Sequence, residues 1–389
     1  MDFYEPAHWA DIRTMAEEFI AEHVTTEMIA EEMTTGDGVS RSLMKALGAR
    51  GWIAPMWPEE EGGAGLNAID AGILSATIRA SGAPTIGHGT TMLPANAVRA
   101  LGSDELKVAI LPGVAAGETL ICLGYTEPEG GSDVFACQTK AERDGDHWRI
   151  NGQKMFTTFA HLADYCFLLT RTMPESVGPS GLTMFLVPLD IPGIERQAVH
   201  TLGYERTNIV YYSDVLIDDF YRIGEPNGGL AVIRAALEAE QNVAPTSRTA
   251  QLAEAAVRWA STTPSTDGGF MIDDTLNRQR LARLAIDGEV TSLLGLRAAY
   301  LDDRGDKPGP LAALFGPETY VSWSAEVLNM VGPDGTIPWT ELDAPLHGIF
   351  EYHYRSAVAT TIYGGTSEVL RSLIAEQRLG LPRSRPKRS

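Results

Sequence analysis

Hydrophobic and polar residues recur along the chain with two different periods, and the period changes twice. The spacing typical of amphipathic helices appears early, in residues 15–24, 40–52, 67–80 and 104–117. Short β-branched and aromatic runs, divided by Gly, Asp and Pro, then predict strands over 119–128, 147–158, 165–172, 182–189 and 208–217. Helical spacing returns in residues 228–242, 273–301, 311–332 and 366–380.

This order predicts three domains, because a chain of 389 residues is too long for one ordinary core. We expect an N-terminal all-α domain over residues 1–120 and a central antiparallel β domain over 121–225. Residues 226–389 are expected to form a C-terminal four-helix bundle that ends in a short basic tail.

Composition excludes several classes of partner. The formal net charge of −20 would repel nucleic-acid phosphates. No apolar run reaches the ~18 residues of a membrane span, and the N-terminus lacks the apolar core of a signal peptide, so we expect a cytoplasmic protein without membrane contact. The three cysteines, Cys122, Cys137 and Cys166, have no CxxC spacing. We therefore expect neither a disulfide framework nor a metal site.

Two polar segments follow predicted strands and are candidates for ligand binding. The first, Gly124–Asp133, is rich in small residues and offers backbone N–H groups with the hydroxyls of Thr126 and Ser132, donors that suit a planar, acceptor-rich ligand or an anion. In the second, Asn151–Thr158, an aromatic ring and two hydroxyls could cover a ring system. On these residues alone, a tight turn and a core phenylalanine are equally open interpretations.

Taken together, the motifs resemble those of the acyl-CoA dehydrogenase family. The matching motifs are TEPEGGSD (126–133), NGQKMFTT (151–158), IYGGTSE (362–368) and the loop PEEEGGAG (58–65). They occur in the family's order over nearly the whole chain. The resemblance implies the family's α–β–α fold and an FAD-dependent oxidoreductase that acts on the CH–CH group of an acyl-CoA, with FAD held between the β domain and the C-terminal bundle.

The resemblance also assigns cofactor contacts to individual positions. Tyr125 and Thr126 match the strand end at the pyrimidine edge of the flavin, and Gly131 and Ser132 match the turn near the pyrophosphate and the acyl-CoA. The remaining FAD positions are Phe156 beside the flavin, where Trp is usual, the adjacent Thr157, and Thr158 near the flavin N5. Thr366 and Glu368 are the positions in the C-terminal loop, where Gln is common at the second.

The implied reaction requires a carboxylate base. It removes the α proton of the thioester and passes the β hydrogen to the flavin N5 as hydride, and the α proton needs a positioned base to leave. Many members place a Glu where this chain has Gly364. Others place it on the first helix of the C-terminal domain, where Glu240 falls at the matching position. Glu240 continues the apolar stripe of that helix, whereas Glu238 lies off it. Gln241 stands where the family often has Arg.

The sequence lacks the motifs that usually hold the adenosine half of FAD. Homotetrameric members supply R-x-x-F-G and Q-x-x-G-G-x-G from a neighbouring subunit, and neither motif is present in residues 262–284 or 328–335. This asymmetry resembles the catalytic subunit of actinobacterial steroid-side-chain acyl-CoA dehydrogenases, which are α2β2 heterotetramers. The implied partners are an acyl-CoA, including a bulky, sterol-type one, an electron-transferring flavoprotein, and a second dehydrogenase-like subunit or further copies of this chain.

Two alternative functions remain at this point. Gly364 and the missing adenosine motifs are also typical of a non-catalytic partner subunit. A related acyl-CoA oxidase or flavin monooxygenase would share the same motifs, because oxygen access to the flavin separates these classes.

Overall fold

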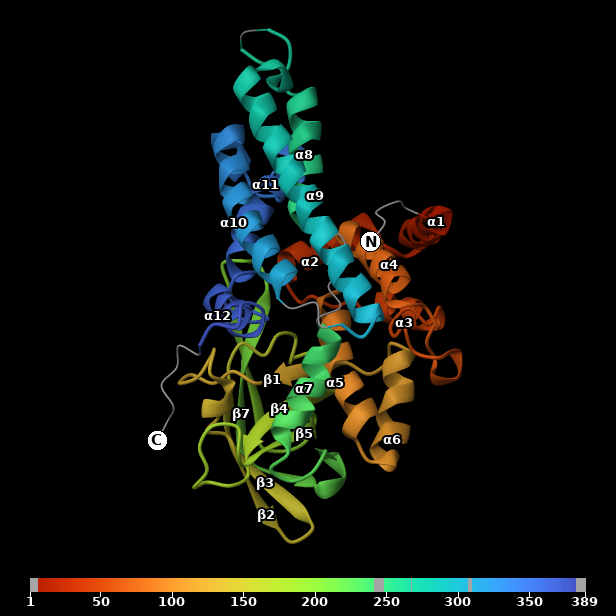
Figure 1. Ribbon diagram of the computed structural model, residues 1–389, viewed down its shortest axis with the longest axis vertical. Helices are drawn as coiled ribbons and strands as arrows, with labels where there is room; N and C mark the ends of the chain where they lie inside the picture. Colours follow the sequence, from red (N-terminus) through yellow and green to blue (C-terminus); the bar gives the residue numbers. More distant parts are fainter. Residues whose placement is uncertain (1–5, 241–247, 267, 307–309, 383–389) are drawn as a thin grey trace.

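In the computed structural model the strands form a sheet at the lower left of Figure 1, and helices from both ends of the chain lie beside and above it. The described residues are 6–240, 248–266, 268–306 and 310–382; for residues 237–240 and 302–303 the description comprises the backbone alone. The N-terminal helices are α1 (Ala7–His23), α2 (Thr26–Thr35), α3 (Arg41–Ala49), α4 (Ala68–Ala80), α5 (Ile86–Leu101) and α6 (Asp104–Ala115).

Side-chain caps fix where several of these helices begin. Thr25, Ser40, Asn67 and Ser103 each accept a backbone N–H of the first turn through a side-chain oxygen. Such caps satisfy donors that have no partner inside the helix. The expected helical periods at 15–24, 40–52, 67–80 and 104–117 all fall on helices of the structure.

The middle of the chain forms one eight-stranded sheet in the order β6-β7-β3-β2-β4-β5-β8, with β1 beside β4. The strands are β1 (Ile121–Gly124), β2 (Lys140–Asp144), β3 (His147–Lys154), β4 (Tyr165–Arg171), β5 (Leu182–Pro188), β6 (Ile194–His200), β7 (Arg206–Asp218) and β8 (Arg222–Ile223). The sheet is mainly antiparallel, as expected, but β1 runs parallel to β4. β4 and β5 are buried almost throughout.

The helices after the sheet are α7 (Gly229–Glu240), α8 (Arg248–Thr262), α9 (Thr275–Asp303), α10 (Leu311–Val331), α11 (Ile349–Ala359) and α12 (Ser367–Gln377). Four of them share a separate hydrophobic core, to which α8, α9, α10 and α11 contribute. A four-helix bundle is therefore present, but of the four helices expected to form it only α9 and α10 contribute to this core, and α8 and α11 take the places expected for α7 and α12. Figure 1 shows α8, α9 and α10 extending away from the sheet.

The membership of this bundle differs from the sequence-based expectation. The apolar residues Val232, Ile233 and Ala236 of α7 belong to the main core rather than to the bundle core, and α7 packs against α5 and β5. Periodicity predicted α7 as a helix but could not tell which neighbour its apolar face would meet. Among the described residues, none of the helices is long and apolar enough to cross a membrane.

Candidate active site

The two polar segments that follow β1 and β3 meet in space. The backbone N–H of Met155 donates to the carbonyl oxygen of Thr126 at 2.8 Å. This bond brings the segment 125–133 against the segment 155–158, so the two motifs that resemble the flavin-contacting motifs form one surface at the end of the sheet.

A buried ion pair fixes this junction. Lys154 Nζ lies 2.7 Å from Glu127 Oε1 and 3.3 Å from the carbonyl oxygen of Tyr125. Lys154 is fully buried, and Glu127 is 6% exposed. The backbone N–H groups of Gln138 and Thr139 donate to the Glu127 carboxylate at 2.6 and 2.9 Å. Each charge thus has an opposite charge and further hydrogen bonds, the condition under which buried ions are tolerated.

The electrostatic environment holds Glu127 in its charged form. Burial alone would raise the pKa of its carboxyl, but the charge and hydrogen bond of Lys154, with the hydrogen bonds from Thr139, outweigh burial and lower the pKa to about 2. The stability that this group contributes is therefore complete above its usual pKa of 4.5 and is lost as the pH falls toward 2. The Glu127 carboxyl is charged at neutral pH.

Phe156 and Thr157 have features typical of a ligand-binding position. Phe156 has a positive φ of 54° and a ring that is 56% exposed, an unusual conformation and exposure for an aromatic residue. Thr157 is fully buried: its backbone N–H donates to the Asn208 carbonyl oxygen at 2.9 Å, and Asn208 Nδ2 donates to the Thr157 carbonyl oxygen at 3.0 Å. The side-chain oxygens Thr157 Oγ1 and Asn208 Oδ1 are nevertheless buried without a hydrogen-bond partner. An unpaired buried polar group costs about 1–3 kcal/mol, so a bound ligand that pairs with these atoms would be stabilised.

The other predicted residues of the two loops are at least partly accessible to solvent. Tyr125 and Thr126 are half-buried, and Gly131 and Ser132 are exposed. The Tyr125 ring stands edge-on to Phe167 at 5.9 Å between centroids. No atom lies within 4 Å of the position that a Cβ of Gly131 would occupy. Thr158 is half-buried next to Thr157.

The backbone conformation of the C-terminal loop accounts for its two adjacent glycines. Gly364 and Gly365 have φ values of 67° and 102°, in the left-handed region where a side chain strains the backbone. The Thr366 hydroxyl then accepts the N–H of Val369 at 3.3 Å and begins α12. Glu368 is exposed in the first turn of α12, and hydrogen bonds from its own backbone N–H and from Thr366 lower the pKa of its carboxyl.

Glu240 is the last residue of α7, and its side chain lies outside the described residues. Its position follows Ala236 by four residues and Val232 by eight, so it falls on the helix face whose earlier residues are buried. The sequence reasoning did not identify Glu127, Lys154 or Asn208 as structurally important. The signal for the first two was available, since each is a charged residue inside a motif that flanks a buried strand.

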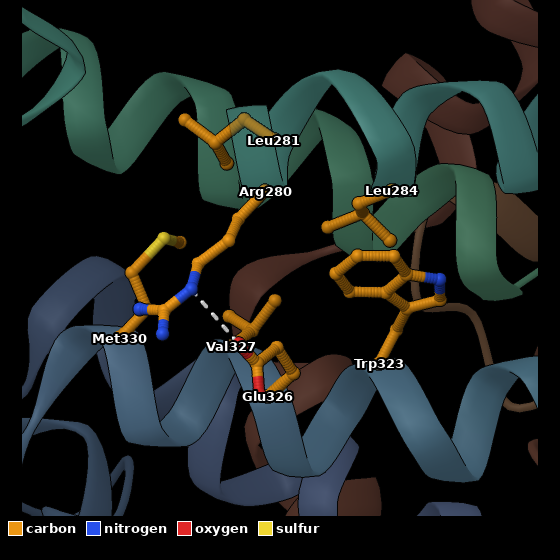
Figure 2. Close-up of a pocket in the computed structure, with 7 residues that line it drawn as sticks. All are labelled: Arg280, Leu281, Leu284, Trp323, Glu326, Val327 and Met330. Atoms are coloured by element: carbon orange, nitrogen blue, oxygen red, sulfur yellow. Dashed lines mark ion pairs between the residues drawn. The ribbon is translucent and has the colours of Figure 1, made fainter. Parts of the chain in front are cut away.

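A separate open groove of about 320 Å³ lies between α9 and α10. Figure 2 shows the adjoining residues, among which Arg280 Nε forms an ion pair with Glu326 Oε1 at 2.9 Å, beside the ring of Trp323. Trp323 Nε1 also donates to Asp287 Oδ2 at 2.6 Å. None of the predicted site residues lines this groove, which belongs to the helical bundle.

Family models match almost the entire chain. The acyl-CoA dehydrogenase N-terminal domain matches residues 7–118, the middle domain 122–215 and the C-terminal domain 227–379. The chain belongs to the acyl-CoA dehydrogenase family. These matches confirm the family suggested by the motifs. Members of this family are FAD-dependent oxidoreductases.

Individual relatives support this membership over the full length. The acyl-CoA dehydrogenase FadE26 of Mycobacterium tuberculosis is 34% identical over 357 residues, covering 89% of each chain. Among solved structures, a chain of the ChsE4–ChsE5 complex from Mycobacterium tuberculosis superposes with a TM-score of 0.88 at 30% identity, covering 99% of this chain and all of that one. A chain of the Tcur3481–Tcur3483 steroid acyl-CoA dehydrogenase gives the same TM-score, identity and coverage.

Removing one member of the Glu127–Lys154 pair is predicted to destabilise the fold. Lys154→Met leaves a buried carboxylate without a counter-charge, and we expect the free energy of unfolding to fall by about 3–5 kcal/mol. The double variant Glu127→Gln with Lys154→Met removes both charges and keeps an oxygen for the N–H groups of Gln138 and Thr139. Chemical denaturation should therefore show that the second substitution recovers part of the loss.

The matched control for this prediction is an exposed ion pair of the same domain. Arg149 Nη2 lies 2.6 Å from Asp144 Oδ2, and both side chains are about half exposed. Arg149→Met is expected to cost roughly 1 kcal/mol or less. Equal losses for Lys154→Met and Arg149→Met would contradict the structural role of the buried pair.

Proposed function

We propose that this acyl-CoA dehydrogenase removes the α proton and the β hydrogen of an acyl-CoA thioester, with Glu240 as the base. The observation that supports this most strongly is the junction of the two flavin-type loops, which presents an exposed Phe156 beside an unpartnered, buried Thr157 hydroxyl. When bound, FAD supplies the oxidising power by accepting the β hydrogen as hydride. The protein contributes binding, orientation and a base.

The proposed cofactor contacts are those of the family resemblance. Phe156 would pack beside the flavin ring, and the hydroxyls of Thr157 and Thr158 would face its polar edge. Tyr125 and Thr126 would meet the pyrimidine edge, and Gly131 with Ser132 would lie near the pyrophosphate and the substrate. Thr366 and Glu368 are the proposed contacts from the C-terminal loop, although the Thr366 hydroxyl also caps α12.

Glu240 is proposed as the base for two reasons. The loop that carries a Glu in many relatives has Gly364 here, and its φ of 67° disfavours any side chain. In addition, position 240 ends a helix that packs by its apolar face against α5 and β5. A carboxylate there takes the α proton while hydrogen bonds to the thioester carbonyl acidify it.

A bulky, sterol-type acyl group and a second subunit form the finer part of the proposal. The solved relatives include one described as a steroid acyl-CoA dehydrogenase and one described as a complex of two named components. This chain lacks the motifs that hold the adenosine half of FAD in homotetramers. The groove between α9 and α10, with the exposed apolar residues Leu276 and Ile286 on α9, offers a surface for such a subunit. The proposed electron acceptor is an electron-transferring flavoprotein.

A non-catalytic partner subunit is the second candidate, and Gly364 with the missing adenosine motifs favours it. The two candidates predict different colours for the purified protein. Our proposal expects a yellow complex with flavin absorption when the chain is co-expressed with a dehydrogenase-like chain that carries R-x-x-F-G. A colourless complex under these conditions would support the non-catalytic alternative.

Replacing the Thr157 hydroxyl is predicted to weaken flavin retention. Thr157→Val preserves the shape of the side chain but removes the unpartnered oxygen, and we expect about tenfold weaker FAD binding, the size of one lost hydrogen bond. Absorbance of the bound flavin after dialysis measures the effect. Thr77→Val is the control, because the Thr77 hydroxyl bonds within α4 to the carbonyl oxygen of Ile73. Equal retention by both variants would remove Thr157 from the proposed site.

Removing the proposed base is predicted to abolish turnover while leaving assembly intact. Glu240→Gln keeps the size of the side chain but cannot accept the proton, so we expect a loss of about 10²–10⁴ in rate with an artificial electron acceptor. Glu238→Gln on the same helix is the control and is expected to retain the wild-type rate. Undiminished turnover by Glu240→Gln would exclude Glu240 as the base.

A further inference from the structure

A side chain that lies outside every sequence motif holds the loop that presents Phe156. Asn208 is near the start of β7 and is fully buried. Its carbonyl oxygen accepts the backbone N–H of Thr157 at 2.9 Å, and its Nδ2 donates to the Thr157 carbonyl oxygen at 3.0 Å. One residue of the sheet thus fixes both backbone polar groups of Thr157.

The conformation of Phe156 depends on the residues on either side of it. The N–H of Met155 donates to the carbonyl oxygen of Thr126 on one side, and Thr157 is held by Asn208 on the other. Phe156 itself has a φ of 54° and is 56% exposed. A strained backbone conformation persists only where its surroundings determine it strongly. Because most of Phe156 is free of packing, the restraint comes from these two neighbours.

His161 determines which way the Asn208 amide points. Asn208 Nδ2 lies 3.3 Å from His161 Nδ1, and His161 Nε2 lies 2.7 Å from Asp37 Oδ1. A carboxylate only accepts hydrogen bonds, so Nε2 carries the proton and Nδ1 of the neutral ring accepts. Burial outweighs the hydrogen bond of Asp37 and lowers the pKa of His161, which favours the neutral ring. The nitrogen of the Asn208 amide therefore faces His161.

Asp37 connects this arrangement to the N-terminal helices. It lies in the loop between α2 and α3, where the Gly36 carbonyl oxygen accepts the N–H of Arg206, the first residue of β7, at 2.8 Å. The Asp37 and His161 side chains are 23% and 14% exposed, and Arg206 Nη1 lies 3.8 Å from Asp37 Oδ1. A continuous series of hydrogen bonds thus joins the N-terminal helical region to the loop of Phe156.

We propose that Asn208 is a positioning residue for the loop of Phe156 and Thr157, and that His161 and Asp37 set the orientation of its amide. The inference rests on the proposed function and deepens it, because these residues outside the family motifs hold the proposed flavin contacts in place. In the observed orientation, Nδ2 donates to both Thr157 and His161. A reversed amide would direct Oδ1 at the Thr157 carbonyl oxygen, and two acceptors in contact repel each other.

Two substitutions at His161 separate its two hydrogen bonds. An asparagine amide reaches about as far as the ring Nδ1, whereas a glutamine amide reaches the position of Nε2. His161→Asn therefore keeps an acceptor for Asn208, and His161→Gln keeps the contact with Asp37. Titration of FAD into the dialysed full-length protein, co-purified with its partner subunit if one is required, measures the effect. We expect about tenfold weaker FAD binding for His161→Gln, and less than about threefold for His161→Asn.

Hydrogen exchange reports the conformation of the loop with and without FAD. Peptides that cover residues 155–160 are followed by mass spectrometry in the full-length protein. Asn208→Leu keeps the size of the side chain and removes its amide, and we expect exchange in these peptides to become about tenfold faster. His161→Gln is expected to have the same effect.

The matched control removes a buried hydrogen bond elsewhere in the same sheet. The Thr170 hydroxyl is buried and donates to the carbonyl oxygen of Thr183 at 3.1 Å. Thr170→Val is expected to leave both the exchange of peptides 155–160 and the FAD affinity unchanged.

The outcomes separate positioning from a general role in folding. Wild-type exchange in both Asn208→Leu and His161→Gln would overturn the proposal, as would equal losses of FAD affinity in His161→Asn and His161→Gln. Faster exchange with unchanged FAD affinity would also overturn it, because the loop would then move without consequence for the flavin. Faster exchange in the variants of a protein that binds no FAD as wild type would support the role of Asn208 in the loop and contradict the proposed function.

Discussion

The buried ion pair between Glu127 and Lys154 joins two segments that are far apart in the sequence, and the candidate site is built on that junction. Glu127 draws the residues after β1 toward the backbone of Gln138 and Thr139, while Lys154 ends β3. Because both charges are shielded from water, neither segment can separate without exposing or isolating a charge. The pair therefore holds Phe156 and Thr157, which follow Lys154 directly, against the strand end of β1.

This constraint connects the sequence motifs to different physical roles. Within TEPEGGSD, Glu127 is structural, and the small residues Gly131 and Ser132 remain accessible. Within NGQKMFTT, the lysine is structural, whereas Phe156 is exposed with a positive φ and the Thr157 hydroxyl is unpartnered. One part of each motif stabilises the junction, and the other part is available to a ligand. In IYGGTSE, the glycines accommodate a left-handed turn and the threonine caps α12.

The sequence was sufficient to predict the α–β–α order, the family and most of the helices. A long amphipathic period indicates a helix whichever neighbours that helix packs against. It did not reveal β6, whose residues are mostly exposed and polar, or the bundle helices α8 and α11. It also placed α7 in the bundle, although the apolar face of that helix meets α5 and β5. Periodicity describes one helix face at a time, and the choice among possible neighbours depends on contacts distant in sequence.

The sequence motifs identified the two loops of the β domain that meet in space, whereas residues outside these motifs could not be identified from the sequence. The loops that contain Thr126 and Met155 each carry a family motif, whereas Asn208, which is hydrogen-bonded to Thr157, belongs to no motif and was found only from its position in space. The assignment of Glu240 depends on the resemblance and on the empty position at Gly364. It is the residue on which the proposed chemistry depends.

Exchange of the α proton measures that chemistry most directly. The flavin-loaded protein, with its partner subunit if required, is incubated with a saturated acyl-CoA in D₂O without an electron acceptor, and the recovered thioester is analysed by mass spectrometry. We predict incorporation of deuterium at the α carbon by the wild-type protein and by Glu238→Gln, but not by Glu240→Gln. Equal incorporation by Glu240→Gln, with its flavin still bound, would contradict the assignment of Glu240 as the base.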